Sequence, residues 1–155
     1  MSRARIVLHL VALVAPILAA GAFCALLLRS ETPSAWRQAG VLGGIGALAA
    51  QIAAGLCWRS LDRRARAGSG AWKTGLGMAA LTHLLFGVLL TAALALSIRF
   101  LDAGDSGTAR DLLLQAAFFA LASLTTVGAV TLPLSAWLAQ AIAALRRKEF
   151  ADDAR

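Results

Sequence analysis

Long apolar runs separated by short polar stretches dominate the pattern of residues along the chain. The first run, Ile6 to Leu28, contains 23 residues without a charged side chain. At about 1.5 Å per residue a helix of this length spans roughly 34 Å, enough to cross a hydrocarbon core of about 30 Å. Two further runs of similar character cover about 35–58 and about 73–98. This pattern predicts membrane-spanning helices rather than the core of a soluble domain.

The last apolar stretch is too long for a single span. Leu112 to Leu145 contains 34 residues, which would measure about 51 Å as one straight helix. Pro133 lies about 31 Å along from Leu112, and proline disfavours helical geometry in the residue before it. We therefore predict a fourth span over about 112–132. Beyond Pro133, a short interfacial helix over about 134–148 and a bent continuation of the fourth helix both fit the pattern.

These runs together predict the fold class, an all-α integral membrane protein built as a four-transmembrane-helix bundle, with one membrane domain over 1–155. Residues 59–70 combine clustered arginines with Gly-Ser-Gly, which is typical of a loop between the second and third spans. Lys and Arg gather near both termini and in this loop, and the positive-inside rule then predicts that all three are cytoplasmic. Ten basic residues on that side oppose four on the other: Arg3, Arg5, Arg59, Arg63, Arg64, Arg66, Lys73, Arg146, Arg147 and Lys148 against Arg29, Arg37, Arg99 and Arg110.

The composition supports a lipid environment and excludes nucleic acid as a partner. Hydrophobic residues make up 59% of the 155 positions, and the mean hydropathy of +0.75 is well above that of soluble domains. The net charge of +7 comes from short basic clusters at the ends of apolar runs, not from one basic face. The preference for Arg over Lys and the many Ala and Gly residues are typical of a bacterium with a GC-rich genome, so the expected location is a bacterial inner membrane.

Polar side chains near the middle of the expected membrane are the first candidates for chemistry. None of the spans carries a charged residue between its interfaces, whereas cation-coupled transporters usually keep one there. An unpaired polar group in hydrocarbon costs several kcal/mol, so polar residues should face inward and bond one another or a carbonyl. His83 and Ser123 each lie about 16 Å into their spans from opposite sides, so their depths match. The predicted polar band contains Gln51, Thr82, His83, Ser123, Thr125 and Thr126.

A ladder of small residues marks the second span. Gly40 and Gly44 are four residues apart, as are Gly43 and Ala47, and Ala50 continues the pattern. Small residues at this spacing let another backbone approach closely, so dispersion and weak Cα–H contacts can hold helices together in lipid. The partner could be a neighbouring helix of the same chain, a second copy or a larger subunit.

The segment Ser123-Leu124-Thr125-Thr126-Val127-Gly128 resembles the start of a potassium-channel selectivity filter. That resemblance implies successive backbone carbonyls and a Thr hydroxyl that replace the water around an ion. The family continues with an aromatic residue and Gly, whereas this chain continues with Ala129 and Val130. The departure weighs against such a channel.

No arrangement typical of an enzyme occurs in the sequence. There is no nucleophile with His and Asp, no His and Glu metal spacing, no P-loop and no dinucleotide fingerprint. A haem held by His9 and His83 is disfavoured because their expected depths differ by roughly 10 Å. The sequence therefore predicts no catalytic centre, no metal site and no cofactor.

Two functional hypotheses remain. The leading one is a non-catalytic accessory or interaction protein that associates through its Gly- and Ala-rich second helix with itself or with a larger membrane complex, its basic loops lying against anionic lipid. The alternative is a small transporter or channel subunit whose polar path runs past His83, Gln51, Ser123 and Thr126.

Overall fold

The computed structural model describes residues 2–26, 33–100 and 107–154, and all regular structure within these ranges is helical. The helices are α1 (Arg3–Leu26), α2 (Pro33–Arg66), α3 (Trp72–Phe100) and α4 (Ala109–Asp153). Each is long and apolar enough to cross a membrane. The prediction of an all-helical chain with four such helices is therefore confirmed. Leu27 and Leu28, the end of the first expected span, lie outside the described residues.

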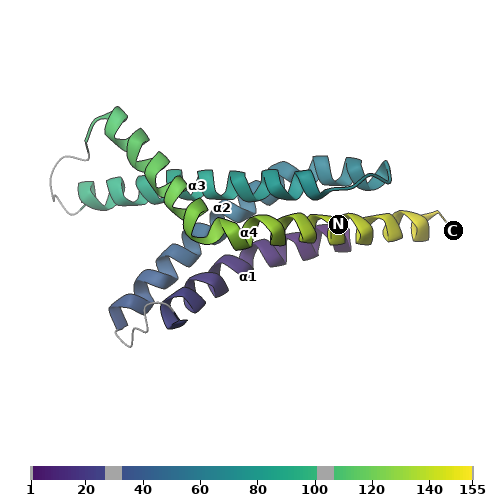
Figure 1. The fold of residues 1–155 in the computed structure, drawn as a ribbon, viewed down its shortest axis with the longest axis horizontal. Helices are drawn as coiled ribbons and strands as arrows, with labels where there is room; N and C mark the ends of the chain where they lie inside the picture. Colours follow the sequence, from purple (N-terminus) through teal and green to yellow (C-terminus); the bar gives the residue numbers. More distant parts are fainter. Residues whose placement is uncertain (1, 27–32, 101–106, 155) are drawn as a thin grey trace.

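The helices pack as two pairs, α1 with α2 and α3 with α4. Helix α2 joins the pairs through contacts with α3 and α4, and α1 also touches α4. The pairs run side by side at the end that holds both termini and the α2–α3 turn, and they diverge toward the opposite end (Figure 1). The main hydrophobic core contains residues from all four helices: Ala4, Leu8, Ala53, Ala54, Leu61, Ala65, Ala71, Met78, Ala139, Ile142 and Ala143.

Helix α2 is longer than predicted, and the expected loop from residue 59 onward is wrong as far as Arg66. Leu61 is 1% exposed and Ala65 is 2% exposed, and both belong to the core that Ile142 of α4 shares. Burial of this apolar pair outweighs the loop tendency of the surrounding arginines. The loop itself is reduced to the short turn between α2 and α3.

The end of α2 is fixed by Gly68, whose φ of 66° lies in the left-handed region. The Gly68 N–H donates to the Ala65 carbonyl at 3.2 Å, and the Ser69 N–H donates to the Arg64 carbonyl at 3.0 Å. These two bonds form the motif that commonly closes a helix at glycine, where a side chain would strain the backbone. The turn that brings α3 back alongside α2 follows from this glycine.

Helix α4 continues through Pro133 to Asp153, so the predicted helix end near Leu132 is wrong, and the bent continuation is the alternative that the structure adopts. Thr108 caps its start in a reciprocal capping box with Asp111. Proline removes one backbone N–H, which weakens the helix without ending it when neighbouring helices support both sides. Figure 1 shows α4 changing direction in its middle. The segment beyond Pro133 supplies Ala139, Ile142 and Ala143 to the core.

Candidate functional site

Helix α3 presents a buried row of small and polar residues to α4. Gly75, Ala79, His83, Gly87 and Thr91 are spaced four apart, and all five are buried. A Cβ added at Gly75 would lie 2.7 Å from the Ala136 Cα, and one added at Gly87 would lie 2.7 Å from the Ala120 backbone nitrogen. The backbones of α3 and α4 therefore touch on both sides of His83. The sequence contained this ladder, but the prediction considered only the one in the second span.

His83 is held between the two helices by hydroxyl groups. His83 is only 6% exposed. The ring Nδ1 lies 2.8 Å from the Ser123 Oγ, and the Nε2 lies 2.8 Å from the Thr131 Oγ1. A neutral imidazole has one donor and one acceptor nitrogen, and a hydroxyl can take either role, so both nitrogens are satisfied. Ser123 meets His83 as their matched depths suggest, whereas Thr131 was missed.

Gln51 bonds His9 of α1 rather than any residue of α3 or α4. The Gln51 side-chain nitrogen donates to the His9 carbonyl at 2.6 Å, and its Oε1 lies 2.7 Å from the His9 Nδ1. The predicted band is thus divided between the helix pairs, with one histidine in each. No hydrogen bond between described residues connects Gln51 with His83. This pair was not predicted, because nothing in the sequence indicates that His9 of α1 lies at the level of Gln51.

The remaining threonines of the band bond their own helices. Thr82 donates to the Met78 carbonyl at 2.9 Å, and Thr126 donates to the Ala122 carbonyl at 2.7 Å. Thr125 donates to the carbonyls of Leu121 and Ala122, and both Thr125 and Thr126 are exposed. Such bonds satisfy a hydroxyl without any partner helix.

The filter-like segment does not form an extended loop. Residues 123–128 lie within α4, where helical geometry directs backbone carbonyls along the helix axis rather than toward a shared ion path. The segment is helical, as expected of the fourth span. Gly128 has a local packing role, because a Cβ there would lie 2.9 Å from the Leu124 Cδ1.

The ladder of α2 has an inner and an outer side. Gly43, Ala47 and Ala50 are buried, and a Cβ added at Gly43 would lie 3.1 Å from the Ile17 Cα of α1. Gly40 and Gly44 are exposed, and no atom of the described chain lies within 4 Å of a Cβ added at either. One side of the ladder is thus used by α1, and the other side is open.

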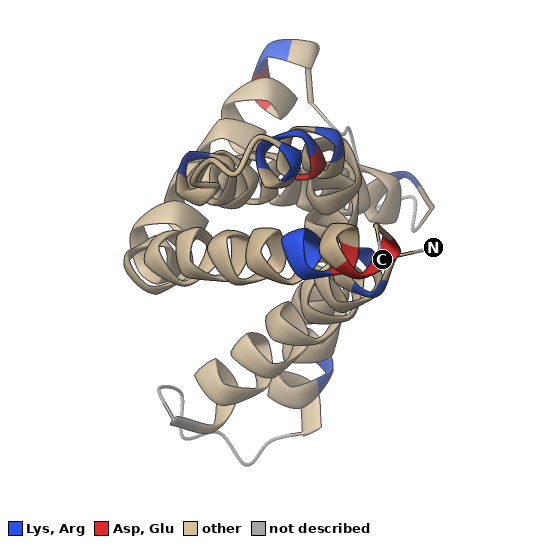
Figure 2. Ribbon diagram, turned by 90° about the vertical axis from the view of Figure 1, so that its right-hand side faces the viewer, with Lys and Arg blue, Asp and Glu red and all other residues tan. Residues whose placement is uncertain are grey.

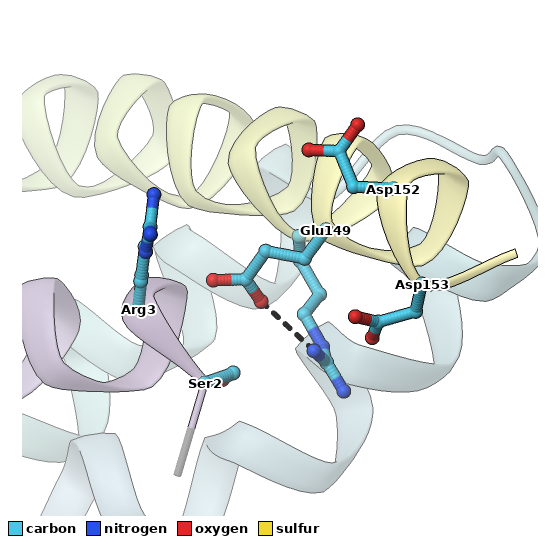
Figure 3. Close-up of a pocket in the computed structure, with 6 residues that line it drawn as sticks. Ser2, Arg3, Glu149, Asp152 and Asp153 are labelled. Carbon is cyan, nitrogen blue, oxygen red and sulfur yellow. Dashed lines mark hydrogen bonds and ion pairs between the residues drawn. The ribbon is translucent and has the colours of Figure 1, made fainter. Parts of the chain in front are cut away.

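A cluster of charged residues, which the sequence prediction missed, joins three helices beyond the apolar runs. The Arg146 side chain of α4 donates to Asp62 of α2 at 2.8 Å and to Glu149 at 2.8 Å. The other Glu149 oxygen accepts the Ala4 N–H at the start of α1, at 2.9 Å. Figure 3 shows the Glu149 carboxylate directed toward the N-terminal residues Ser2 and Arg3, and a dashed line marks its bond with Arg146. The bonds to Asp62 and Ala4 tie α4 to α2 and α1.

The electrostatics of this cluster favour charged carboxylates. Burial raises the pKa of Asp62, but hydrogen bonds from Arg146 and Arg66 lower it more, so the pKa lies below its ordinary value. The pKa of Glu149 is lowered in the same way, against burial, by Arg146 and by the Ala4 N–H. Phe150 adds to the cluster, because the guanidinium of Arg146 lies 4.0 Å from its ring centroid and that of Arg66 lies 4.8 Å away.

An open hollow of about 470 Å³ lies beside the cluster, lined by Ser2, Arg3, Arg146, Glu149, Asp152 and Asp153. Two arginines and three carboxylates line it, so charges of both signs face the hollow. In the described part of the chain, no three His, Cys, Asp or Glu residues gather as metal ligands. We call Asp62, Arg146 and Glu149 the clasp, because their bonds join α4 to α2 and α1.

No family model, curated protein or solved structure matches this chain.

Proposed function

We propose that the protein is a non-catalytic accessory or interaction protein of a membrane, which associates through the outer side of α2 with itself or with a larger membrane complex. The observation that carries this proposal is the open position of Gly40 and Gly44, beside a Gly43 that already packs on α1. The inner side of the same ladder shows how closely another helix can approach such glycines.

Helices in lipid associate through close backbone packing rather than through the hydrophobic effect. Apolar side chains gain little by leaving lipid for a protein surface, so helices associate where their backbones can come close. Gly40 and Gly44 expose one stretch of backbone over a single turn, and Val41 and Leu48 beside them are 61% and 53% exposed. A partner helix laid there could gain dispersion and Cα–H contacts that lipid chains supply poorly.

The alternative of a transporter or channel subunit receives less support from the geometry. Both ring nitrogens of His83 are bonded to hydroxyls, and Gln51 is bonded twice to His9. A permeating ion or substrate would have to replace these internal bonds, which act as contacts within each helix pair. The polar groups therefore favour helix association over a continuous path.

We further propose a bacterial inner membrane as the location, with both termini in the cytoplasm. The support is the excess of Lys and Arg near the termini and the α2–α3 turn. The arrangement in Figure 1 is compatible with it, because both termini and that turn lie at one end of the molecule.

Substitutions on α2 test the association directly. Gly40→Leu with Gly44→Leu should block the outer side, whereas Gly21→Leu with Gly77→Leu changes two open glycines on α1 and α3 and is the matched control. Native mass spectrometry of the tagged chain, extracted gently from its own membranes, reports the assembled species. We expect the first pair to abolish the assembly and the control pair to retain it. Assembly that survives both pairs, or is lost in both, would refute the proposed surface.

A further inference from the structure

Charge is distributed unevenly between the two ends of the molecule. Figure 2 views the end that carries both termini and the α2–α3 turn, where blue basic segments occur on several helices and red acidic segments lie among them. The acidic residues Asp62 and Glu149 of this end are occupied by Arg146, with Arg66 as a second partner of Asp62. The negative charge of Asp62 and Glu149 is thus paired inside this cluster. Asp152 and Asp153, also at this end, line the hollow together with Arg3 and Arg146.

Two of the outer basic residues lie against tryptophan rings, and a third follows a tryptophan in the sequence. Arg5 is exposed, and its guanidinium lies 5.9 Å from the Trp58 ring centroid. Lys73 is exposed, and its ammonium lies 5.4 Å from the Trp72 ring. Arg59 is exposed and follows Trp58 directly on α2. Among the described residues, no carboxylate forms an ion pair with any of these three.

The tryptophans indicate the depth of these charges. Indole rings favour the boundary between hydrocarbon and water, at the level of the lipid headgroups. Trp72 begins α3, and Trp58 precedes the arginine-rich last turns of α2. The Ser60 Oγ lies 3.4 Å from the Thr74 Oγ1, so the two tryptophans lie near one level. Arg5, Arg59 and Lys73 therefore lie at the level of lipid phosphates and have no protein anion as partner.

We propose that Arg5, Arg59 and Lys73, together with the rings of Trp58 and Trp72, bind the phosphate groups of anionic phospholipids. The cations supply the attraction, and the indoles fix their depth. Arg59 shares α2 with Gly40 and Gly44 but lies at least 15 residues farther along the helix, so this binding surface does not depend on the proposed protein contact.

The test compares lipid retention by the wild-type chain and two triple variants. The purified protein is exposed in detergent to equal amounts of phosphatidylglycerol and phosphatidylcholine with identical acyl chains, and native mass spectrometry counts the lipids bound. Arg5→Gln, Arg59→Gln and Lys73→Gln remove the proposed surface. Arg37→Gln, Arg99→Gln and Arg110→Gln remove the same charge from exposed positions at the other end. Each basic residue near an anionic surface strengthens attraction roughly fivefold, so the first triple should lower the ratio of bound phosphatidylglycerol to phosphatidylcholine at least about tenfold.

The expected result is a strong preference for phosphatidylglycerol in the wild type and the second triple, and its loss in the first. Absence of preference in the wild type, or an equal loss in both triples, would overturn the proposal. Complete release of the lipid by excess inorganic phosphate would also overturn it, by identifying a site for free phosphate. If the first triple proves unstable, the salt dependence of the wild type decides, because a preference unchanged by high salt is not electrostatic.

Discussion

The contact of α3 with α4 at Gly75 offers the sharpest prediction about stability. We consider Gly75→Ala beside Gly77→Ala, two changes on the same helix that add one methyl group each. A Cβ at position 75 would overlap the Ser135 carbonyl oxygen and lie 2.7 Å from the Ala136 Cα. A Cβ at position 77 meets no atom within 4 Å. The pair thus isolates the effect of the close approach.

The expected loss of stability in Gly75→Ala follows from how far α4 would have to move. Carbon atoms in contact prefer separations of about 3.5–4.0 Å, so α4 would have to retreat by roughly 1 Å at this point. Its backbone cannot move aside as a flexible side chain could, and Gly87 holds the same two helices together farther along. Overpacking of this kind costs about 1–3 kcal/mol, and we expect the upper end of that range. The gain in helix propensity, about 1 kcal/mol, occurs in both variants and cancels between them.

The assay is unfolding of each variant in detergent micelles by a denaturant titration, followed by circular dichroism. We expect Gly77→Ala to be at least as stable as the wild type and Gly75→Ala to lie about 3 kcal/mol below Gly77→Ala. Equal unfolding free energies for the two variants would refute the reasoning, because they would mean that the backbones of α3 and α4 do not touch at Gly75.

Two further predictions concern hydrogen bonds and protons. Ser123→Ala or Thr131→Val leaves one nitrogen of His83 without its partner and should each cost about 1–3 kcal/mol in the same titration; wild-type stability in both would show that the ring does not need these hydroxyls. Since the pKa values of Asp62 and Glu149 are lowered by folding, their stabilisation is present at neutral pH and is lost as the pH falls below about 4. The melting temperature should therefore drop on acidification, and by less in Asp62→Asn with Glu149→Gln; an equal drop would place the acid sensitivity elsewhere.

The apolar runs made the four helices predictable, because lipid requires long stretches whose backbone is bonded internally. Hydropathy does not, however, say where a helix stops once it leaves the membrane. Arg59 to Arg66 has the composition of a loop, yet Leu61 and Ala65 find partners on α4 and the helix continues. Proline commonly ends or kinks a helix, so Pro133 predicted the end of the fourth helix. Its effect was overridden because the segment beyond it packs on the other helices, and that support is invisible in the local sequence.

The polar contacts were predictable in kind but not in pairing. Depth along a helix identified His83 and Ser123 as residues at one level, and the structure brings them together. Depth does not determine which helices are neighbours, so Gln51 was grouped with His83, although its partner is His9 on α1. The clasp of Asp62, Arg146 and Glu149 was hidden for a related reason. In the sequence these residues belong to basic clusters near the membrane surface, and only the folded chain shows that they meet.

The division of polar groups between the two helix pairs has a consequence for function. Each pair satisfies its own histidine, through Gln51 in one case and through Ser123 and Thr131 in the other. The carboxylates of the clasp are likewise paired with Arg146 of the same chain. Two outward features of the described residues stand apart from these internal bonds, the open glycines Gly40 and Gly44 and the basic residues near the tryptophans, which form no ion pair. Both lie on the outside, where another helix or a lipid headgroup can reach them. Within the described residues the Thr91 hydroxyl is the one buried side-chain polar group without a hydrogen-bond partner, and the others are bonded within the chain. Internal bonding of the polar groups, with glycines and cations left outward, supports the proposal of association over transport.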